Sequence, residues 1–298
     1  MKKTRILVPP GIGDVYWVLV KLKSFIETNN LYPPELTIVS YPDDMNAHLR
    51  SIPFLEMVDG ISIGEPKSIA NASGLDDLWN EAYYGPGRSI FHGTMGYDFF
   101  IAYNGCINSG WMLEDADGYA CDWTGPLRNI QIESPMCGIP SAKILLCFFP
   151  FVGTYLSHER DFPVHMIAES INRIALLYDL TPVFIGGKTE QVHDVLRDGL
   201  VRAVPGSIDL VGGTLLAETF GLLRDCRMIF GYHSGIPNLG VAMKKPAVLL
   251  WDARFPEGTS YACVPPDTRN TTYHAVPTKG LTVDTLMPYL ENACAISL

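Results

Sequence analysis

Two glycines and a carboxylate follow the first apolar run of the chain, in the stretch Gly11-Ile12-Gly13-Asp14. The glycines let the backbone turn sharply and approach a ligand closely. Asp14 has two interpretations. It is either an N-cap of the following helix, worth about 1 kcal/mol, or a carboxylate that faces a cleft and accepts a proton from a hydroxyl. Tyr16 stands where a dinucleotide-binding fingerprint needs its third glycine, so the stretch is a weak match to that class.

A second candidate lies at YHSGIPN, residues 232–238, between an apolar run and a helical pattern. The amides of Ser234 and Gly235 would lie at a helix N-terminus, which is a ready anion site. Pro237 suits the first turn of a helix. The simpler alternative is that Ser234 only caps the helix and that His233 is a hydrogen-bonded histidine at the rim.

Charged residues after other apolar runs supply further candidates. Arg160 is a cation that could face a diphosphate, or else a solvated charge paired with its acidic neighbours. Lys188 follows Gly186-Gly187, but the earlier glycine of a phosphate-binding P-loop is missing, which excludes a nucleoside triphosphatase of that type. Asp115 and Asp117 match the Asp-x-Asp pattern of metal-dependent glycosyl transfer. Such short matches are frequent by chance, so no metal site is predicted.

Composition narrows the class of protein. The chain has 298 residues, 47% hydrophobic and 18% charged, as expected for a globular protein of two domains. No apolar run is long enough to span a membrane or to form a signal peptide, which predicts a cytoplasmic protein. Seven scattered cysteines fit reduced thiols. A net charge of −10 makes nucleic acid a poor default partner.

The candidate site residues need strands and helices that position them. Along the chain, short apolar runs alternate with stretches of helical periodicity. This alternation implies parallel sheets with helical crossovers, an α/β fold. Strands are predicted at 5–10, 35–42, 57–64, 97–105, 143–150, 181–187, 207–213, 227–233 and 246–252. The clearest helices are predicted at 15–30, 164–180, 190–200, 215–226, 236–245 and 281–293, with weaker ones at 45–55 and 75–84.

Two such series, each opening with a strand that ends in proline, predict two Rossmann-like domains, 1–139 and 140–298. The final helix, 281–293, is free to pack back on the first domain. Ligands bind outside the carboxyl ends of parallel strands. All the loops that carry candidate residues follow strands, so two domains with those edges facing each other would form a cleft.

The stretch 209–251 resembles the signature region of glycosyltransferase family 9, the heptosyltransferase family. The loop at Asp14 is similar to the Gly-x-Gly-Asp loop of that family, and VFIGGKTE, 183–190, resembles its Gly-Gly-x-x-Glu strand end. The match is good over 200–251 and poor over 65–138. The positions that fit in the signature region are Leu210, Gly212, Thr214, Leu215 or Leu216, Glu218, Ser234, Gly235, Leu239, Ala242 and Pro246.

The resemblance implies a GT-B fold, with the acceptor site in the first domain and a nucleotide-diphosphate sugar in the second. It implies an inverting transfer without metal or other cofactor, with Asp14 as the catalytic base on the acceptor-side loop of Gly11 and Gly13. The residues that it implies for donor binding are Arg160, Lys188, Glu218, His233, Ser234, Gly235 and Asn238. Two of these depart from the family, because His233 stands where it usually has Asp and Asn238 where it usually has His.

Three alternatives to a transferase with a glycan or other hydroxyl acceptor stay open. A nucleotide-sugar epimerase can share the fold, with His233 and His158 as acid and base. A non-catalytic nucleotide-sugar binder would have no use for Asp14. A glycosyltransferase that acts on modified DNA bases is disfavoured by the acidic charge.

Overall fold

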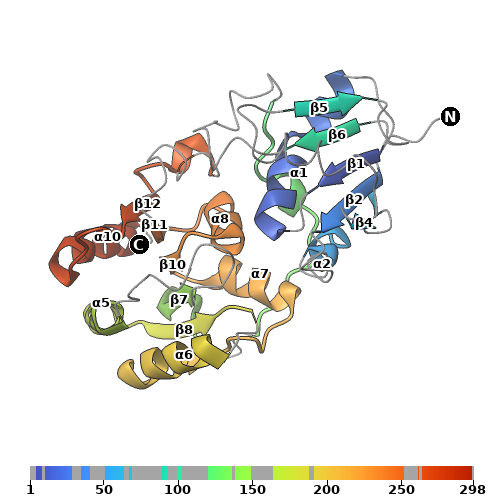
Figure 1. Cartoon of the computed structure of the whole chain (residues 1–298). Coiled ribbons are helices and arrows are strands. Elements are labelled where there is room, and N and C mark those ends of the chain that lie inside the picture. The colour runs from blue at the N-terminus through green and yellow to red at the C-terminus, as the bar shows by residue number, and fades with distance from the viewer. Residues whose placement is uncertain are drawn as a thin grey trace. The chain divides into compact units, whose positions relative to one another are not determined.

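The structure, a computed structural model, describes residues 5–8, 11–28, 35–40, 51–63, 67–68, 89–92, 99–102, 120–135, 138–148, 164–187, 191–251, 261 and 264–296. Contacts within the chain divide it into two units. The first unit is Met1–Gln131 with Arg254–Val264, and the second is Ile132–Ala253 with Pro265–Leu298. Each unit is built on one sheet (Figure 1).

The first sheet has the strand order β3-β2-β1-β6-β5, and β4 also pairs with β2. Every pair is parallel except β5 with β6, which is antiparallel. This edge strand, which was not predicted, is the exception to the parallel pairing expected from the sequence. The elements are β1 (Arg5–Val8), α1 (Ile12–Thr28), β2 (Glu35–Ser40), α2 (Ile52–Leu55), β3 (Ser62–Ile63), β4 (Lys67–Ser68), β5 (Ser89–His92), β6 (Phe99–Ala102) and the short 3₁₀ helix η4 (Gly125–Leu127).

The second sheet is parallel throughout, in the order β12-β11-β10-β7-β8-β9. Its elements are η5 (Ser141–Lys143), β7 (Ile144–Phe148), α5 (Val164–Tyr178), β8 (Thr181–Ile185), α6 (Gln191–Ala203), β9 (Ile208–Asp209), α7 (Leu216–Asp225), β10 (Met228–Tyr232), α8 (Gly235–Ala242), β11 (Ala247–Trp251), η6 (Pro266–Thr268), β12 (Tyr273–Pro277) and α10 (Val283–Ile296).

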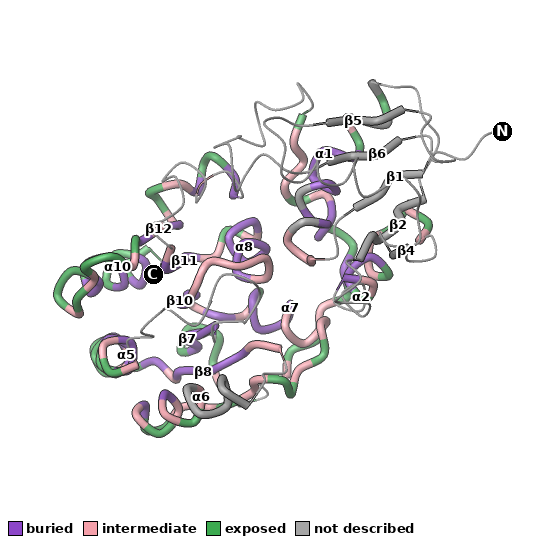
Figure 2. The backbone as a smooth tube through the Cα atoms, in the orientation of Figure 1, coloured by how far each residue is buried: buried purple, intermediate pink, exposed green. Residues whose placement is uncertain are grey.

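Three layers make up the second unit. Helices α5, α6 and α10 cover one face of the sheet, and α7 and α8 cover the other. Strand β7, with the sequence ILLCF, is buried at every position because both faces are covered. Figure 2 shows buried strands between helices whose outer sides are exposed. An uninterrupted apolar run in the sequence thus corresponds to a central strand.

The start of one helix and the number of strands differ from the sequence-based prediction. Helix α1 begins at Ile12, not at Val15, because the N–H groups of a first turn need no partner within the helix and glycine is tolerated there. Strands β5 and β12 were not predicted. Strand β12 mixes polar and apolar residues and lies at an edge, where its terminal Pro277 is allowed. Helix α10, which the sequence left free to pack on the first domain, has α5 and β10 to β12 of the second unit as its packing partners.

In both sheets the chain adds strands first on one side of the first strand and then on its other side. In the first sheet β2 and β6 flank β1, and in the second sheet β8 and β10 flank β7. The crevice outside the carboxyl ends of the strands at such a switch point is where open α/β sheets bind ligands. The loop of Gly11 follows β1, and the turn at His233 follows β10. Each candidate loop therefore lies at the switch point of its own sheet.

Residues 132–134 pack closely on helix α7. A Cβ atom on Gly221 would lie 1.4 Å from the backbone oxygen of Glu133. The Arg224 side chain donates to the Ile132 oxygen over 3.5 Å. This segment opens the second unit. Glycine is thus required at position 221 by the close approach of two backbones.

We expect Gly221→Ala to destabilise the protein by about 2–3 kcal/mol, the upper range for overpacking, as measured by urea unfolding. Gly199, in helix α6, is the matched control because a Cβ there would meet nothing within 4 Å. Gly199→Ala should stabilise by up to about 1 kcal/mol through helix propensity. Equal stability of the two variants would mean that residues 132–134 move aside at little cost.

Candidate functional site

The loop after β1 places Asp14 in the first turn of α1. Gly11 bends the chain, and its carbonyl oxygen accepts the first helical hydrogen bond from the Val15 amide at 3.0 Å. Asp14 is therefore the third residue of the helix and not its N-cap. A carboxylate in a first turn still complements the helix dipole. Gly11 and Gly13 are half-buried.

The turn after β10 forms a helix N-terminus, where two amides have no partner within the helix. Ser234 has the extended backbone of an N-cap, but its hydroxyl makes no cap hydrogen bond. Gly235 and Ile236 open helix α8, Pro237 has no N–H, and the Asn238 amide already donates to the Ser234 oxygen at 3.3 Å. The helix can therefore offer an anion the N–H groups of Gly235 and Ile236, and the Ser234 hydroxyl is not engaged as a cap.

His233 and Asn238 connect the end of β10 to helix α8. The Asn238 Nδ2 atom lies 3.1 Å from His233 Nε2. The two residues occupy the position before the N-cap and the fourth helical position, where many helices have a pair of apolar side chains that fixes the entry of the chain. Here the pair is polar. The His233 amide also donates to the Leu250 oxygen at 2.9 Å, which ties the turn to β11.

The surroundings of His233 keep it neutral. Its ring lies edge-on to the Trp251 ring, with centroids 4.0 Å apart and 78° between the planes. Burial lowers the pKa of His233 to about 3. With Asn238 donating to Nε2, the proton of the neutral ring is on Nδ1. Asn238 itself is only 1% exposed, and its Oδ1 atom has no hydrogen-bond partner among the residues that the structure describes.

Close packing fixes the strand that leads to this turn. A Cβ on Gly231 would lie 2.7 Å from the Phe148 oxygen of the neighbouring strand. A Cβ on Gly240 would lie 2.3 Å from the Ile229 side chain, so α8 sits directly on β10. Sequence reasoning missed Gly231, Gly240 and Trp251. The signal for Gly231 was a glycine inside an apolar strand, which often marks a close backbone approach.

Glu218 has a local structural role. Its Oε2 atom accepts a hydrogen bond from the Leu215 amide at 2.7 Å at the start of α7. This is half of a capping box, because Leu215 has no side-chain acceptor to complete it. The other carboxylate oxygen, Oε1, is not used in this bond.

Several candidate residues lie outside the described part of the chain. Arg160, Lys188 and His158 belong to this group, as do Asp115 and Asp117. Among the residues that the structure does describe, no three His, Cys, Asp or Glu side chains gather in a group that could hold a metal ion. No described helix is long and apolar enough to cross a membrane.

Comparison of the sequence with protein-family profiles and with curated proteins finds no match. Solved structures do match over the whole chain. The E. coli heptosyltransferase WaaC with ADP has a TM-score of 0.62 at 10% identity, covering 97% of this chain and 100% of WaaC. A glycosyl transferase of family 9 from Veillonella parvula has a TM-score of 0.56 at 13% identity, with coverage of 99% and 97%. The fold is GT-B.

The GT-B fold is shared by enzymes of more than one class. A Listeria monocytogenes protein assigned as a UDP-N-acetylglucosamine 2-epimerase matches with a TM-score of 0.52 at 12% identity, covering 100% of this chain and 90% of that one. The fold class predicted from the sequence is thus confirmed.

The neutral state of His233 predicts a loss of stability in acid. Its pKa is about 6.5 in the unfolded chain and about 3 in the folded protein, so protons bind the unfolded state preferentially. The stabilisation is complete above pH 6.5 and is lost as the pH falls towards 3. We expect His233→Phe, which cannot titrate, to reduce the pH dependence of the unfolding free energy below pH 6 by about 1 kcal/mol per pH unit.

Urea unfolding of both proteins at pH 7 and pH 5 checks this prediction. The carboxylates titrate in both proteins, so their contribution cancels in the comparison. Identical pH dependence in the two proteins would show that His233 is protonated as readily in the folded state as in the unfolded state.

Proposed function

We propose that the protein is an inverting glycosyltransferase that moves a sugar from a nucleotide-diphosphate sugar to an acceptor hydroxyl without a metal ion. One observation carries the proposal. The two stretches that resemble the motifs of glycosyltransferase family 9, 11–14 and 233–238, follow β1 and β10 at the switch points of the two sheets. The GT-B fold supports it.

Asp14 is the proposed base. As the acceptor oxygen bonds to the anomeric carbon of the sugar, its proton passes to the Asp14 carboxylate. The bond from the anomeric carbon to the phosphate oxygen breaks, and the nucleoside diphosphate leaves with the electron pair. The attack comes from the face opposite the leaving group, so the configuration inverts.

The second unit is proposed to bind the donor. The first-turn amides of Gly235 and Ile236, with Ser234, would stabilise the negative charge that develops on the diphosphate, and Arg160 and Lys188 are proposed as its cationic partners. Glu218 Oε1 is the proposed acceptor for a hydroxyl of the nucleoside. Amides and side-chain cations do the work of a metal ion in this scheme.

A nucleotide-sugar epimerase is the second candidate, favoured by the match to the Listeria protein. An epimerase needs groups that exchange protons with the sugar near neutral pH. His233 is poorly suited, since its pKa is about 3 and its Nε2 atom is occupied by Asn238. Incubation with a nucleotide sugar alone separates the two candidates, because an epimerase isomerises its substrate without an acceptor.

A transferase that acts on DNA bases is disfavoured by the charge of −10.

Binding of nucleotides to wild type and to Gly235→Val tests the proposed donor site. Nucleotide sugars and nucleoside diphosphates with adenine, uracil or guanine bases are screened by thermal shift, with and without excess EDTA. We expect one base to be preferred, binding to survive EDTA, and Gly235→Val to weaken diphosphate binding about tenfold, because its side chain crowds the first-turn amides.

Gly138→Val is the control for this experiment, since a Cβ at Gly138 would meet nothing within 4 Å and the residue lies away from the turn in sequence. Its backbone φ of 102° will cost stability but not nucleotide affinity. Strict dependence on Mg²⁺ would favour Asp115 and Asp117 and contradict the proposal.

The donor sugar is proposed to differ from the heptose of the ADP-heptose enzymes that share this fold. The basis is the replacement of the usual carboxylate by His233. We propose a nucleotide-linked pentose or hexose in its place.

A further inference from the structure

A segment of the first unit lies along the helix that carries Asp14. Residues 120–130, called the strap here, include η4, which packs against α1. Figure 1 shows η4 beside α1. The two elements are about a hundred residues apart in the sequence.

The strap is attached to one stripe of α1 at three points. The Tyr16 hydroxyl donates to the Trp123 oxygen at 2.6 Å. The Asp122 amide donates to the Val20 oxygen at 2.6 Å, and the Ala120 amide donates to Ser24 Oγ at 2.9 Å. Positions 16, 20 and 24 are four residues apart and share one helix face. The strap therefore runs antiparallel to α1 along that face.

The burial of α1 agrees with this attachment. Tyr16 is 0% exposed, and every described side chain from Val15 to Leu22 is buried, which requires cover on both sides of the helix. Figure 2 shows this buried stretch. A buried tyrosine hydroxyl needs a partner, and the Trp123 oxygen provides it.

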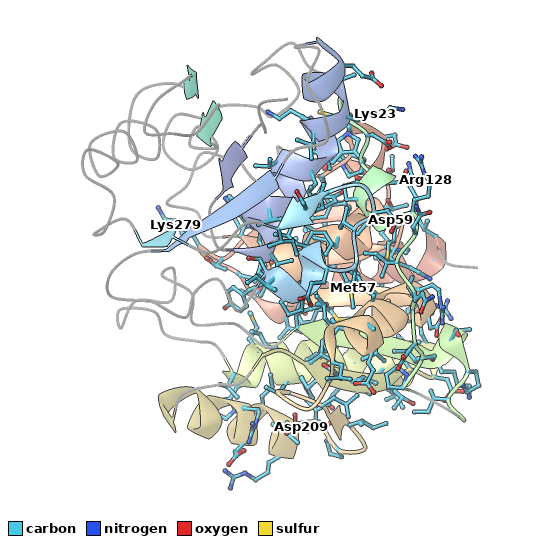
Figure 3. All side chains as sticks on the ribbon, turned by 90° about the vertical axis from the view of Figure 1, so that its right-hand side faces the viewer. Lys23, Met57, Asp59, Arg128, Asp209 and Lys279 are labelled. Atoms are coloured by element: carbon cyan, nitrogen blue, oxygen red, sulfur yellow. The ribbon has the colours of Figure 1, made fainter. Side chains whose placement is uncertain are left out.

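The strap has its own fixed shape. The Asp122 carboxylate accepts a hydrogen bond from the Gly125 amide at 3.0 Å and pairs with Arg128 at 3.2 Å. Asn129 donates to Asp59 at 2.8 Å, and Figure 3 shows Arg128 and Asp59 on the same side of the protein. The strap thus offers α1 a rigid support.

Tyr16 is the attachment nearest to Asp14, two residues further along the same helix. We infer that Tyr16 is a positioning residue, whose hydroxyl fixes the start of α1 against the strap and so fixes the helix backbone at Asp14. The inference rests on the proposed role of Asp14 as base. A small displacement of a catalytic group can reduce turnover by up to about a hundredfold.

Tyr16→Phe and Ser24→Ala form a matched pair, since each removes one attachment, at opposite ends of the stripe. Hydrogen exchange of the full-length protein is measured by mass spectrometry on peptides that cover residues 11–19. Tyr16→Phe should speed exchange there by about tenfold, as expected for the loss of one buried hydrogen bond. Ser24→Ala should leave it unchanged.

Turnover is measured as release of nucleoside diphosphate from the nucleotide sugar selected by the thermal-shift panel, with water as acceptor, per folded molecule. We expect Tyr16→Phe to lower kcat by about tenfold with an unchanged KM for the donor, and Ser24→Ala to stay within about twofold. Asp122→Ala, which frees the turn of the strap without altering α1, should lower kcat in the same direction, and it replaces Tyr16→Phe as the test variant if that protein does not fold.

Equal turnover in Tyr16→Phe and Ser24→Ala, or a donor KM that changes as much as kcat, overturns the inference. Full activity of an Asp14→Asn variant overturns the proposed base instead. The two failures are thus distinguishable.

Discussion

Asp14→Asn should lower turnover by about 10²–10⁴-fold, the usual range for loss of a general base. Asparagine has nearly the same shape but cannot accept a full proton from the acceptor hydroxyl. Donor binding should be unchanged, because the proposed donor residues belong to the second unit. The measurement is the initial rate of nucleoside diphosphate release, with the donor affinity determined separately by calorimetry.

Asp284→Asn is the control for the structural role of a carboxylate in a first turn. Asp284 lies in the first turn of α10, is 91% exposed and pairs with Arg173 at 3.4 Å. Both variants lose a favourable interaction with a helix dipole, worth up to about 1 kcal/mol. Only Asp14→Asn should lose turnover. If both variants keep wild-type rates, Asp14 is a charge that stabilises its helix and nothing more.

The central strands and the helices between them could be predicted because a strand that is buried on both faces is apolar at nearly every position. Strands β7, β10 and β11 are apolar runs, and β10 is followed directly by a turn and helix α8. The connection rules then place the loops after these strands at one edge of the sheet. The sequence therefore predicts a helix N-terminus at Ser234 and Gly235, and α8 begins at Gly235 with Ser234 as its N-cap.

The edges of the sheets could not be predicted in the same way. Strand β9 has two residues and β12 mixes polar and apolar side chains, so neither differs from a loop in its pattern. The antiparallel direction of β5 depends on pairing with β6, which no local pattern encodes. Such strands form because a neighbouring strand offers hydrogen bonds, and not because their own residues favour an extended chain.

Contacts between residues that are distant in the chain also could not be predicted from the sequence. His233, Asn238 and Trp251 meet only because β10, α8 and β11 are adjacent, and the bond from Tyr16 to Trp123 crosses a hundred residues. The role of Glu218 shows the opposite case. Its contact is local, because Glu218 stands three residues after Leu215, the spacing of a capping box, and accepts from the Leu215 amide.

The surroundings of His233 bear on the choice of donor sugar. In the family that the sequence resembles, a carboxylate usually stands at this position and can accept hydrogen bonds from two sugar hydroxyls. His233 is neutral because of burial, and Asn238 occupies its Nε2 atom. Only the Nδ1 hydrogen is left, which is a donor and not an acceptor. The site therefore cannot reproduce the paired acceptance of a carboxylate.

We therefore expect ADP-heptose to be a poorer donor than a nucleotide-linked pentose or hexose by roughly tenfold to a hundredfold in kcat/KM. A buried hydroxyl that loses its acceptor costs about 1–3 kcal/mol, which corresponds to that range. Transfer rates from ADP-heptose and from ADP-, UDP- and GDP-linked pentoses and hexoses, measured side by side, check the expectation. His233→Asp should raise the rate with ADP-heptose relative to the best natural donor, because it restores the two acceptors, whereas His233→Gln, which stays neutral, should not. If ADP-heptose is the best donor of the wild-type protein, His233 points away from the sugar and another part of the site recognises it.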